Sequence, residues 1–239
     1  MFPDNGQKMA LTARNGSTVT VRMEVNPRAK RLILRLDEKA REAVAVAPRP
    51  RDLPAAAAFA SERVDWIAAN LSRVPQSVAF EPGASFPLRG EPCRLSLDGQ
   101  GRRARLVTEP ALVLQAPGAP ETFAARVTRY LKTAAKSDLG DAVSTHCAAL
   151  GVEASTISVK DTRSRWGSCT SDGRLSFSWR LICAPPTVLD YVAAHECAHR
   201  LEMNHSDRFW AHVQRICPDW KRHRAWLRAH GRALHAIGG

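Results

Sequence analysis

Residues 195–206, HECAHRLEMNHS, constrain the fold of this chain more than any other stretch. They hold three of its 8 histidines. His195 and His199 are four residues apart, which on a helix places both imidazoles on one face, about 40° apart around the axis. Two imidazoles so placed can share one tetrahedral metal ion. The stretch therefore predicts a helix that presents two metal ligands on one side.

Glu196 stands next to the first of these histidines and would lie beside the metal rather than on it. From there its carboxylate can hold and deprotonate a water that the metal activates. The HExxH pattern accordingly predicts a hydrolase with Zn²⁺ as its cofactor and Glu196 as the general base. The preceding residues are typical of a helix with Thr187 as its N-cap.

A third ligand is needed, because a hydrolytic zinc usually has three protein ligands and a water. If the helix continued, His205 would point roughly 80° away from His195 and could not reach the same ion. We therefore predict that the helix ends at Asn204, since asparagine tolerates the left-handed conformation at a helix C-terminus. Ser206 is the expected N-cap of a second helix, and His205 the third ligand from the turn between them.

The secondary structure of the rest of the chain follows from hydrophobic periodicity. Alternating apolar residues predict strands in STVTVRMEV, RLILRLD and AVAVAP, within the first 50 residues. Residues 53–71 are expected to form one helix. Residues 78–115 return to strand character, and residues 121–150 read as a long helix.

A short segment rich in proline and glycine, QAPGAP at 115–120, is the expected domain boundary. The predicted organisation is a β-rich N-terminal region with one helix at 1–118, followed by a catalytic domain at 119–239. The predicted fold class is therefore α+β.

The segment RWGSCTSDGRLSFSWRL predicts a β-hairpin, with its turn around residues 171–173. We expect this hairpin to supply an edge strand above the active-site helix, where an extended substrate can pair with the main chain. Trp166 and Gly167 are then substrate-binding candidates, as an apolar wall and a point of close backbone approach. The alternative is that Trp166 is a core residue and Gly167 a bulge.

Composition limits the other classes of function. No apolar segment resembles a signal peptide or reaches the roughly 18 residues of a membrane helix, so a cytoplasmic protein without a membrane partner is expected. The 6 cysteines form no CxxC pair and are expected to be buried. The net charge of +12 includes basic clusters at 28–35, 102–105 and 221–232. We interpret them as solvated surface; the alternative is contact with a polyanion such as nucleic acid.

Several motifs together resemble the YgjP-like metal-dependent hydrolases, which are related to SprT-like and WLM-type zinc metallopeptidases. The resemblance spans nearly the whole chain, through VNPRAKRLILRLD, RVDWIAANL, PGASFPLRG, RSRWGSC, LSFSWRLICAP, LDYVAAHECAH and NHSDRFW. It implies a metzincin- or gluzincin-like catalytic core after a β-rich region. It also implies zinc held by His195, His199 and His205, with Glu196 as catalytic base.

One departure from the metzincin pattern affects the expected local geometry. That pattern has a glycine at the position of Glu202, which lets the active-site helix end early. Without it, the turn is expected later, around Met203 and Asn204. No Met-turn is evident downstream.

Three functions fit the sequence to different degrees. The main expectation is a zinc metallopeptidase with a peptide or protein substrate. A nucleotide phosphohydrolase would suit the positive charge, but the chain has no glycine-rich phosphate loop and no carboxylate cluster for magnesium. A nucleic-acid-associated protein with structural zinc is the third, although structural sites usually fill all four positions with protein ligands. The group that would stabilise an oxyanion is left open among an Arg, a Tyr and a downstream histidine.

Overall fold

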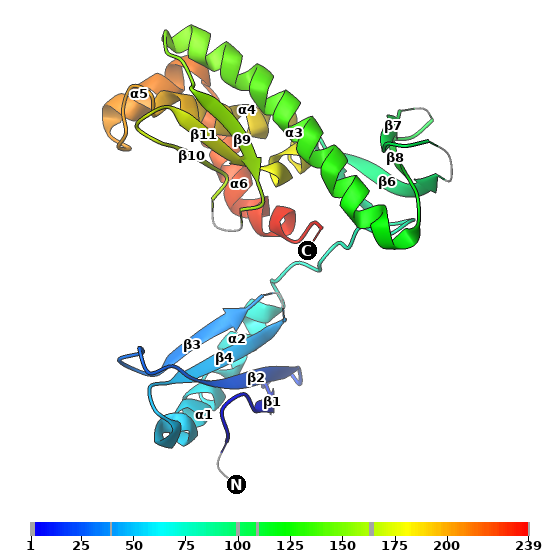
Figure 1. The fold of residues 1–239 in the computed structure, drawn as a ribbon. Helices are drawn as coiled ribbons and strands as arrows, with labels where there is room; N and C mark the ends of the chain where they lie inside the picture. The colour runs from blue at the N-terminus through cyan, green and yellow to red at the C-terminus, as the bar shows by residue number, and fades with distance from the viewer. Residues whose placement is uncertain (1–2, 39, 99–100, 109, 163–164, 239) are drawn as a thin grey trace. The chain divides into compact units, whose positions relative to one another are not determined.

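The computed structural model describes residues 3–38, 40–98, 101–108, 110–162 and 165–238 (Figure 1). It divides into two compact units, Met1–Gln76 and Ser77–Gly239. Both combine strands with helices, so the predicted α+β class is confirmed. The first two residues of the RSRWGSC motif, 163 and 164, lie outside the described residues.

The first unit is a four-stranded sheet covered by helices on one side. Its elements are β1 (Lys8–Thr12), β2 (Thr18–Val25), β3 (Ile33–Asp37), β4 (Glu42–Ala47), a short 3-10 helix (Pro50–Asp52), α1 (Leu53–Ser61) and α2 (Val64–Leu71). The strand order is β1-β2-β4-β3, with β2 and β4 parallel. The buried carboxylate of Glu42 accepts hydrogen bonds from Lys8 and Arg22, which lower its pKa.

The single helix expected at 53–71 is in fact two helices. The chain leaves helical geometry at Arg63, whose φ of −112° and ψ of 15° interrupt the hydrogen-bond ladder. The two helices bury different apolar residues. α1 buries Ala56 and Ala60 and α2 buries Ile67 and Leu71, so each packs its own short stripe on the sheet.

The second unit is built around one long helix, as the sequence predicts for 121–150. Its elements are β5 (Ser85–Leu88), β6 (Glu91–Asp98), β7 (Arg105–Val107), β8 (Val113–Pro117), α3 (Pro120–Leu150), β9 (Thr156–Lys160), β10 (Gly167–Cys169), β11 (Arg174–Ser178), a 3-10 helix (Trp179–Cys183), α4 (Pro186–Ala198), α5 (Asp207–Ile216) and α6 (Trp220–His235). Strands β5-β6-β8-β7 form one sheet and β10-β11-β9 another. α3 runs from the first of these sheets to the helices α4–α6 (Figure 1).

The hydrophobic core of the second unit is continuous from β5 to α6. Leu95 and Leu114 from the β5–β8 sheet belong to the same buried cluster as Phe123 of α3 and Phe177 of β11. The boundary expected at 115–120 therefore lies inside this unit, while the compact units divide after Gln76. QAPGAP turns the chain from β8 into α3 and does not separate two cores. No described helix is long and apolar enough to cross a membrane.

Candidate metal centre

The helix α4 carries the first two histidines and is packed inside the second unit. Nine of its residues are buried, including Val188, Val192 and Ala194, and a helix that is apolar on nearly all sides is a core helix. It begins at Pro186 with Pro185 as N-cap, so the expected cap at Thr187 is not observed. Proline suits this position because the first backbone N–H of a helix has no partner.

The C-terminal end of α4 comes earlier than the sequence suggests. The helix ends at Ala198, and Asn204 is not among the described non-glycine residues with positive φ. The expected stop at Met203–Asn204 is therefore wrong. The backbone tightens after Ala198 through i→i+3 hydrogen bonds, from Arg200 N to Cys197 O and from Leu201 N to Ala198 O. Such 3-10 turns commonly close a helix, and here no glycine is needed.

The turn between α4 and α5 holds His205 as predicted, with Ser206 as the N-cap of α5. The Ser206 hydroxyl accepts a hydrogen bond from Phe209 N at 3.4 Å. Asn204 has a different role from the one expected: its side-chain oxygen accepts from Ser206 N at 3.0 Å. This side-chain-to-backbone turn fixes the direction of the chain on both sides of His205.

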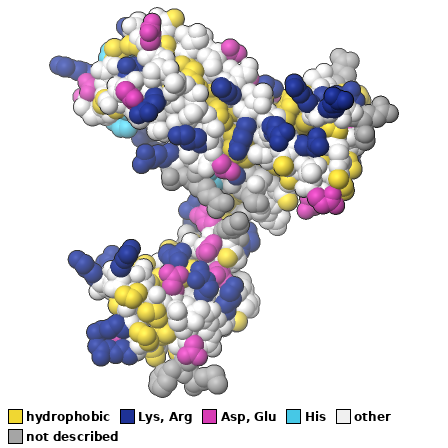
Figure 2. Space-filling model, viewed as in Figure 1, with side chains coloured by type: hydrophobic (Ala, Val, Ile, Leu, Met, Phe, Trp, Pro, Cys, Tyr) yellow, Lys and Arg dark blue, Asp and Glu magenta, His cyan; other side chains and the backbone are white. Residues whose placement is uncertain are grey.

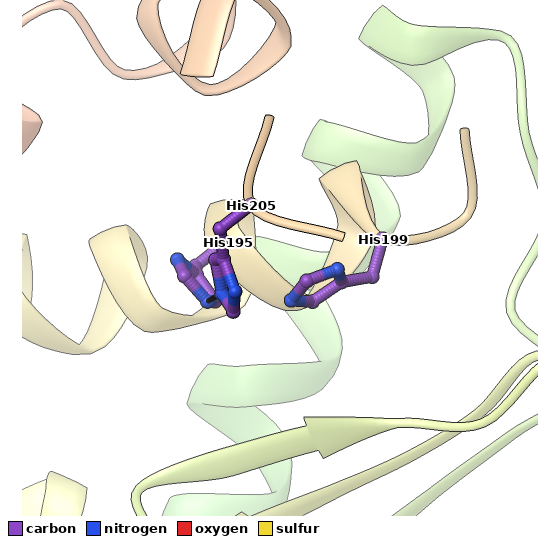
Figure 3. A group of neighbouring side chains, drawn as sticks. All are labelled: His195, His199 and His205. Atoms are coloured by element: carbon purple, nitrogen blue, oxygen red, sulfur yellow. Dashed lines mark hydrogen bonds between the residues drawn. The ribbon is translucent and has the colours of Figure 1, made fainter. Parts of the chain in front are cut away.

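The three histidine side chains converge on one space (Figure 3). Each imidazole offers one nitrogen, and these three nitrogens lie within 4.8 Å of one another. Nε2 of His195 is 3.1 Å from Nε2 of His205. Two nitrogens bound to one tetrahedral zinc at about 2.0–2.1 Å would be roughly 3.3 Å apart. The described residues contain one cluster of three or more His, Cys, Asp or Glu side chains that could hold a metal ion. It consists of His195, His199 and His205.

Phe209 supports all three imidazoles, a role that was not predicted from the sequence. Its ring centroid lies 4.8, 4.4 and 4.8 Å from those of His195, His199 and His205, and the side chain is fully buried. Ser206 caps α5 and thereby places Phe209, three residues later, under the cluster. The capping pattern in NHSDRF is the signal that could have found it.

The protonation of the rings suits metal binding. Nδ1 of His199 lies 3.0 Å from the carbonyl oxygen of Glu202, which can only accept, so Nδ1 donates and Nε2 keeps its lone pair. Burial lowers the pKa of His195 to about 3 and also lowers the pKa of His199. Both rings are therefore neutral at neutral pH.

A metal ion fits this set of residues. Nδ1 of His195 is buried without a hydrogen-bond partner among the described residues, so the polar contact of the ring is made by the Nε2 that faces His205. Burying a polar ring has a cost, and a metal bound at Nε2 would offset part of it. Neutral imidazoles are good ligands for zinc, and nothing in the donor set requires another kind of ion.

Glu196 lies beside the cluster in close contact with Gly167. Only 5% of its surface is exposed, and burial raises the pKa of its carboxyl to about 8. A Cβ atom added to Gly167 would be 2.5 Å from Oε1 of Glu196 and 2.7 Å from its Cγ. Glycine is thus the residue that lets β10 pass directly over this carboxylate.

β10 and β11 form the predicted hairpin, and β10 is an edge strand of its sheet. Trp166 precedes β10 and stacks on His235, with centroids 4.2 Å apart. The same side chain lines a pocket of about 440 Å³ together with Gly167 and Glu196. Trp166 is therefore packed against His235 and also forms a wall of the pocket beside Glu196, and its contact with substrate stays a prediction.

Two further pocket residues were not singled out from the sequence. Tyr191 lies four residues before His195 on α4, which places both on one face, and burial raises the pKa of Tyr191 to about 12. Arg224 comes from α6, so its place beside His195 depends on tertiary packing. Of the downstream histidines, His223 lies 6.4 Å from Tyr191 between ring centroids and is not part of the metal cluster.

An α+β domain with three convergent histidines next to a buried glutamate defines a metal-dependent hydrolase. A family model described as "YgjP-like, metallopeptidase domain" matches residues 30–230. The chain belongs to this YgjP-like metallopeptidase family. The resemblance read from the motifs is thereby confirmed.

Nothing among the curated proteins matches the sequence. Among solved structures, the metallopeptidase zymogen abylysin of Pyrococcus abyssi is similar at 16% identity and a TM-score of 0.36. That likeness covers 38% of this chain and 92% of the other.

Proposed function

We propose that this protein is a zinc-dependent peptidase that uses Glu196 as its general base. The observation that carries the proposal is the convergence of His195, His199 and His205 beside a buried carboxylate that is not itself a member of the cluster. Three protein ligands leave a coordination position open, which is typical of a catalytic rather than a structural zinc. This argues against a purely structural metal in a nucleic-acid-associated protein.

In the proposed reaction, zinc would polarise the scissile carbonyl and acidify the attacking water. Burial alone favours the protonated form of Glu196, but the positive charge of a bound zinc would favour the carboxylate. That carboxylate accepts the proton of the water as the oxygen bonds to the carbonyl carbon. It then delivers the proton to the nitrogen as the C–N bond breaks. Gly167 and Phe209 position the reacting groups, Gly167 against the carboxylate and Phe209 under the imidazoles.

The substrate would lie along the edge strand β10. An extended peptide can add to a free sheet edge by main-chain hydrogen bonds, and Gly167 is the strand residue in contact with Glu196. This register brings a substrate carbonyl next to the base. Trp166 would then act as an apolar wall for a substrate side chain.

Metal analysis beside casein cleavage tests the proposal. The wild-type protein is expected to contain about one zinc per chain and to cleave casein, and a chelator should stop cleavage until zinc is restored. His205→Ala should lower zinc affinity about tenfold or more, because one of three ligands is lost. His212→Ala, on α5 and outside the cluster, is the matched control and should retain zinc. Unchanged zinc in His205→Ala would remove His205 from the ligand set.

A second proposal concerns the basic surface. Lys and Arg side chains gather along α3 and the neighbouring β6–β8 region (Figure 2). A pocket of about 440 Å³ there is lined by Arg102, Arg103, Arg126 and Arg129. None of the four forms an ion pair with a described residue. Four guanidinium groups without an ion pair among the described residues favour a phosphate backbone, so nucleic acid is proposed as an accessory ligand.

The salt dependence of oligonucleotide binding tests this accessory site. Each lost phosphate contact should reduce the slope of log K against log salt concentration by about 0.7–0.9. The double variant Arg126→Gln/Arg129→Gln is therefore expected to weaken binding and flatten the slope by about 1.5. Arg208→Gln/Arg215→Gln on α5 removes the same charge elsewhere and should keep the slope. Equal slopes for the two double variants would contradict the proposed site.

A further inference from the structure

The pocket beside Glu196 is lined by three arginines in addition to the residues already described. Arg165 precedes β10, and Arg224 and Arg228 lie one turn apart on α6. Glu196 is the carboxylate that lines this pocket, and it is buried against Gly167. The pocket therefore has strongly positive walls around the position proposed for the scissile bond.

None of these three arginines has an ion-pair partner among the described residues. Other arginines of the same unit do: Arg89 forms a two-hydrogen-bond pair with Asp138, and Arg180 pairs with Asp161. A guanidinium that faces a pocket and has no carboxylate paired with it keeps its full capacity to bind an anion.

Arg224 is held in place by aromatic rings. Its guanidinium carbon lies 5.0 Å from the ring centroid of Trp210 and 6.0 Å from that of Trp220. The two tryptophans stack on each other at 4.2 Å, and Trp210 also stacks on His205 at 5.9 Å. The same aromatic group thus supports a metal-ligand candidate and a cation, which fixes the charge close to the metal centre.

The positive surface continues along α6 away from the metal centre. A second pocket of about 640 Å³ shares Arg224 and Arg228 with the first and adds Lys221. The helix WKRHRAWLRAHGRALH contains no Asp or Glu. A ligand that fills both pockets would meet cations over more than one residue of its length.

We infer that the substrates are acidic peptide segments, with an Asp or Glu side chain next to the scissile bond bound by Arg224 and Arg228. The inference rests on the proposed peptidase function and names its substrate class. Arg224, which is held in place by Trp210, binds the acidic side chain nearest the scissile bond. Arg228, one turn further along α6, binds the next one.

Matched quenched-fluorescent peptides test this specificity. Two peptides differ only in central Glu-Glu against Gln-Gln, and a third carries Lys-Lys. Wild type is expected to cleave the Glu peptide with a kcat/KM about tenfold or more above that of the Gln peptide. Arg224→Gln and Arg228→Gln should each lower this ratio at least threefold. Arg222→Gln, on the same helix but outside both pockets, should keep it.

Binding to the Glu196→Gln protein provides a readout that does not require cleavage. Zinc-loaded Glu196→Gln should bind the Glu peptide about tenfold more tightly than the Gln peptide in fluorescence anisotropy, and added Arg228→Gln should reduce that ratio. Arg228 is exposed and makes no described ion pair, so its variant should fold even if Arg224→Gln disturbs the tryptophans.

The outcomes separate this inference from the proposed function. Equal cleavage and equal binding of the Glu and Gln peptides would overturn the acidic specificity and leave the peptidase intact. Selective binding without cleavage of any peptide would overturn the peptidase and keep the acidic-ligand site. Release of phosphate or pyrophosphate from nucleoside triphosphates, with no selective peptide binding, would overturn both and assign the arginines to a polyphosphate.

Discussion

Glu196→Gln is expected to lower the rate of peptide hydrolysis by about 10²–10⁴-fold while the protein keeps its zinc. The substitution preserves the shape of the side chain and its contact with Gly167 but removes the proton acceptor, and general base catalysis is typically worth that factor. Zinc content should not change, because Glu196 is not one of the three residues whose donor atoms converge. The measurement is kcat/KM on a peptide substrate together with zinc per chain.

Glu202→Gln is the matched control for this variant. Glu202 contacts His199 through its backbone carbonyl and not through its carboxylate, so the same change there should leave both zinc and activity near wild type. Full activity in Glu196→Gln would eliminate Glu196 as the base. Loss of zinc in the same variant would instead indicate that its carboxylate belongs to the ligand set.

The convergence of the histidines could be predicted because it depends mostly on local geometry. His195 and His199 share a face by helical periodicity, and the Ser206 cap and the position of His205 in the turn follow from short-range rules. The point where α4 ends could not be read in the same way. The helix ends at Ala198 without a glycine, in a turn where the His199 side chain meets the Glu202 carbonyl. That contact depends on the placement of the His199 ring over Phe209 of the next helix.

The arginines that line the pocket could not be predicted as a group from the sequence, because tertiary packing brings them together. Arg165 and Arg224 are 59 positions apart by their numbers and meet only because β10 and α6 both pack near α4. In the sequence, Arg224 and Arg228 look like an ordinary solvated cluster. The stacking of Trp210 on Trp220 gives Arg224 a fixed position, and neither tryptophan carries a local signal for that role.

The domain boundary also depends on tertiary packing that local sequence signals do not reveal. A Pro/Gly segment at 115–120 is a good turn signal, and the chain does turn there from β8 into α3. Whether a turn also separates two cores depends on which side chains pack together. Leu114 before the turn and Phe123 after it belong to one cluster, so the units divide after Gln76 instead.

Gly167→Ala is expected to lower kcat/KM about a hundredfold with zinc content unchanged. The added Cβ would lie 2.5 Å from Oε1 of Glu196, closer than any real contact, so either β10 or the glutamate must move. A displacement of about 1 Å at a reacting group can cost on the order of 10²-fold in rate. The three histidines come from α4 and the following turn, not from β10, so the metal should stay bound.

Gly140→Ala is the matched control, because it adds the same methyl group at a glycine away from the metal centre. Gly140 lies within α3, and an added Cβ there meets nothing within 4 Å. Activity should be unchanged, and stability should rise by about 1 kcal/mol because alanine favours a helix interior over glycine. A double-mutant cycle then separates misplacement of the base from general damage. If Gly167→Ala acts through Glu196, it should cost little further activity in a Glu196→Gln background. An equal hundredfold loss in both backgrounds would show that Gly167 acts on the substrate or the fold and not on the base.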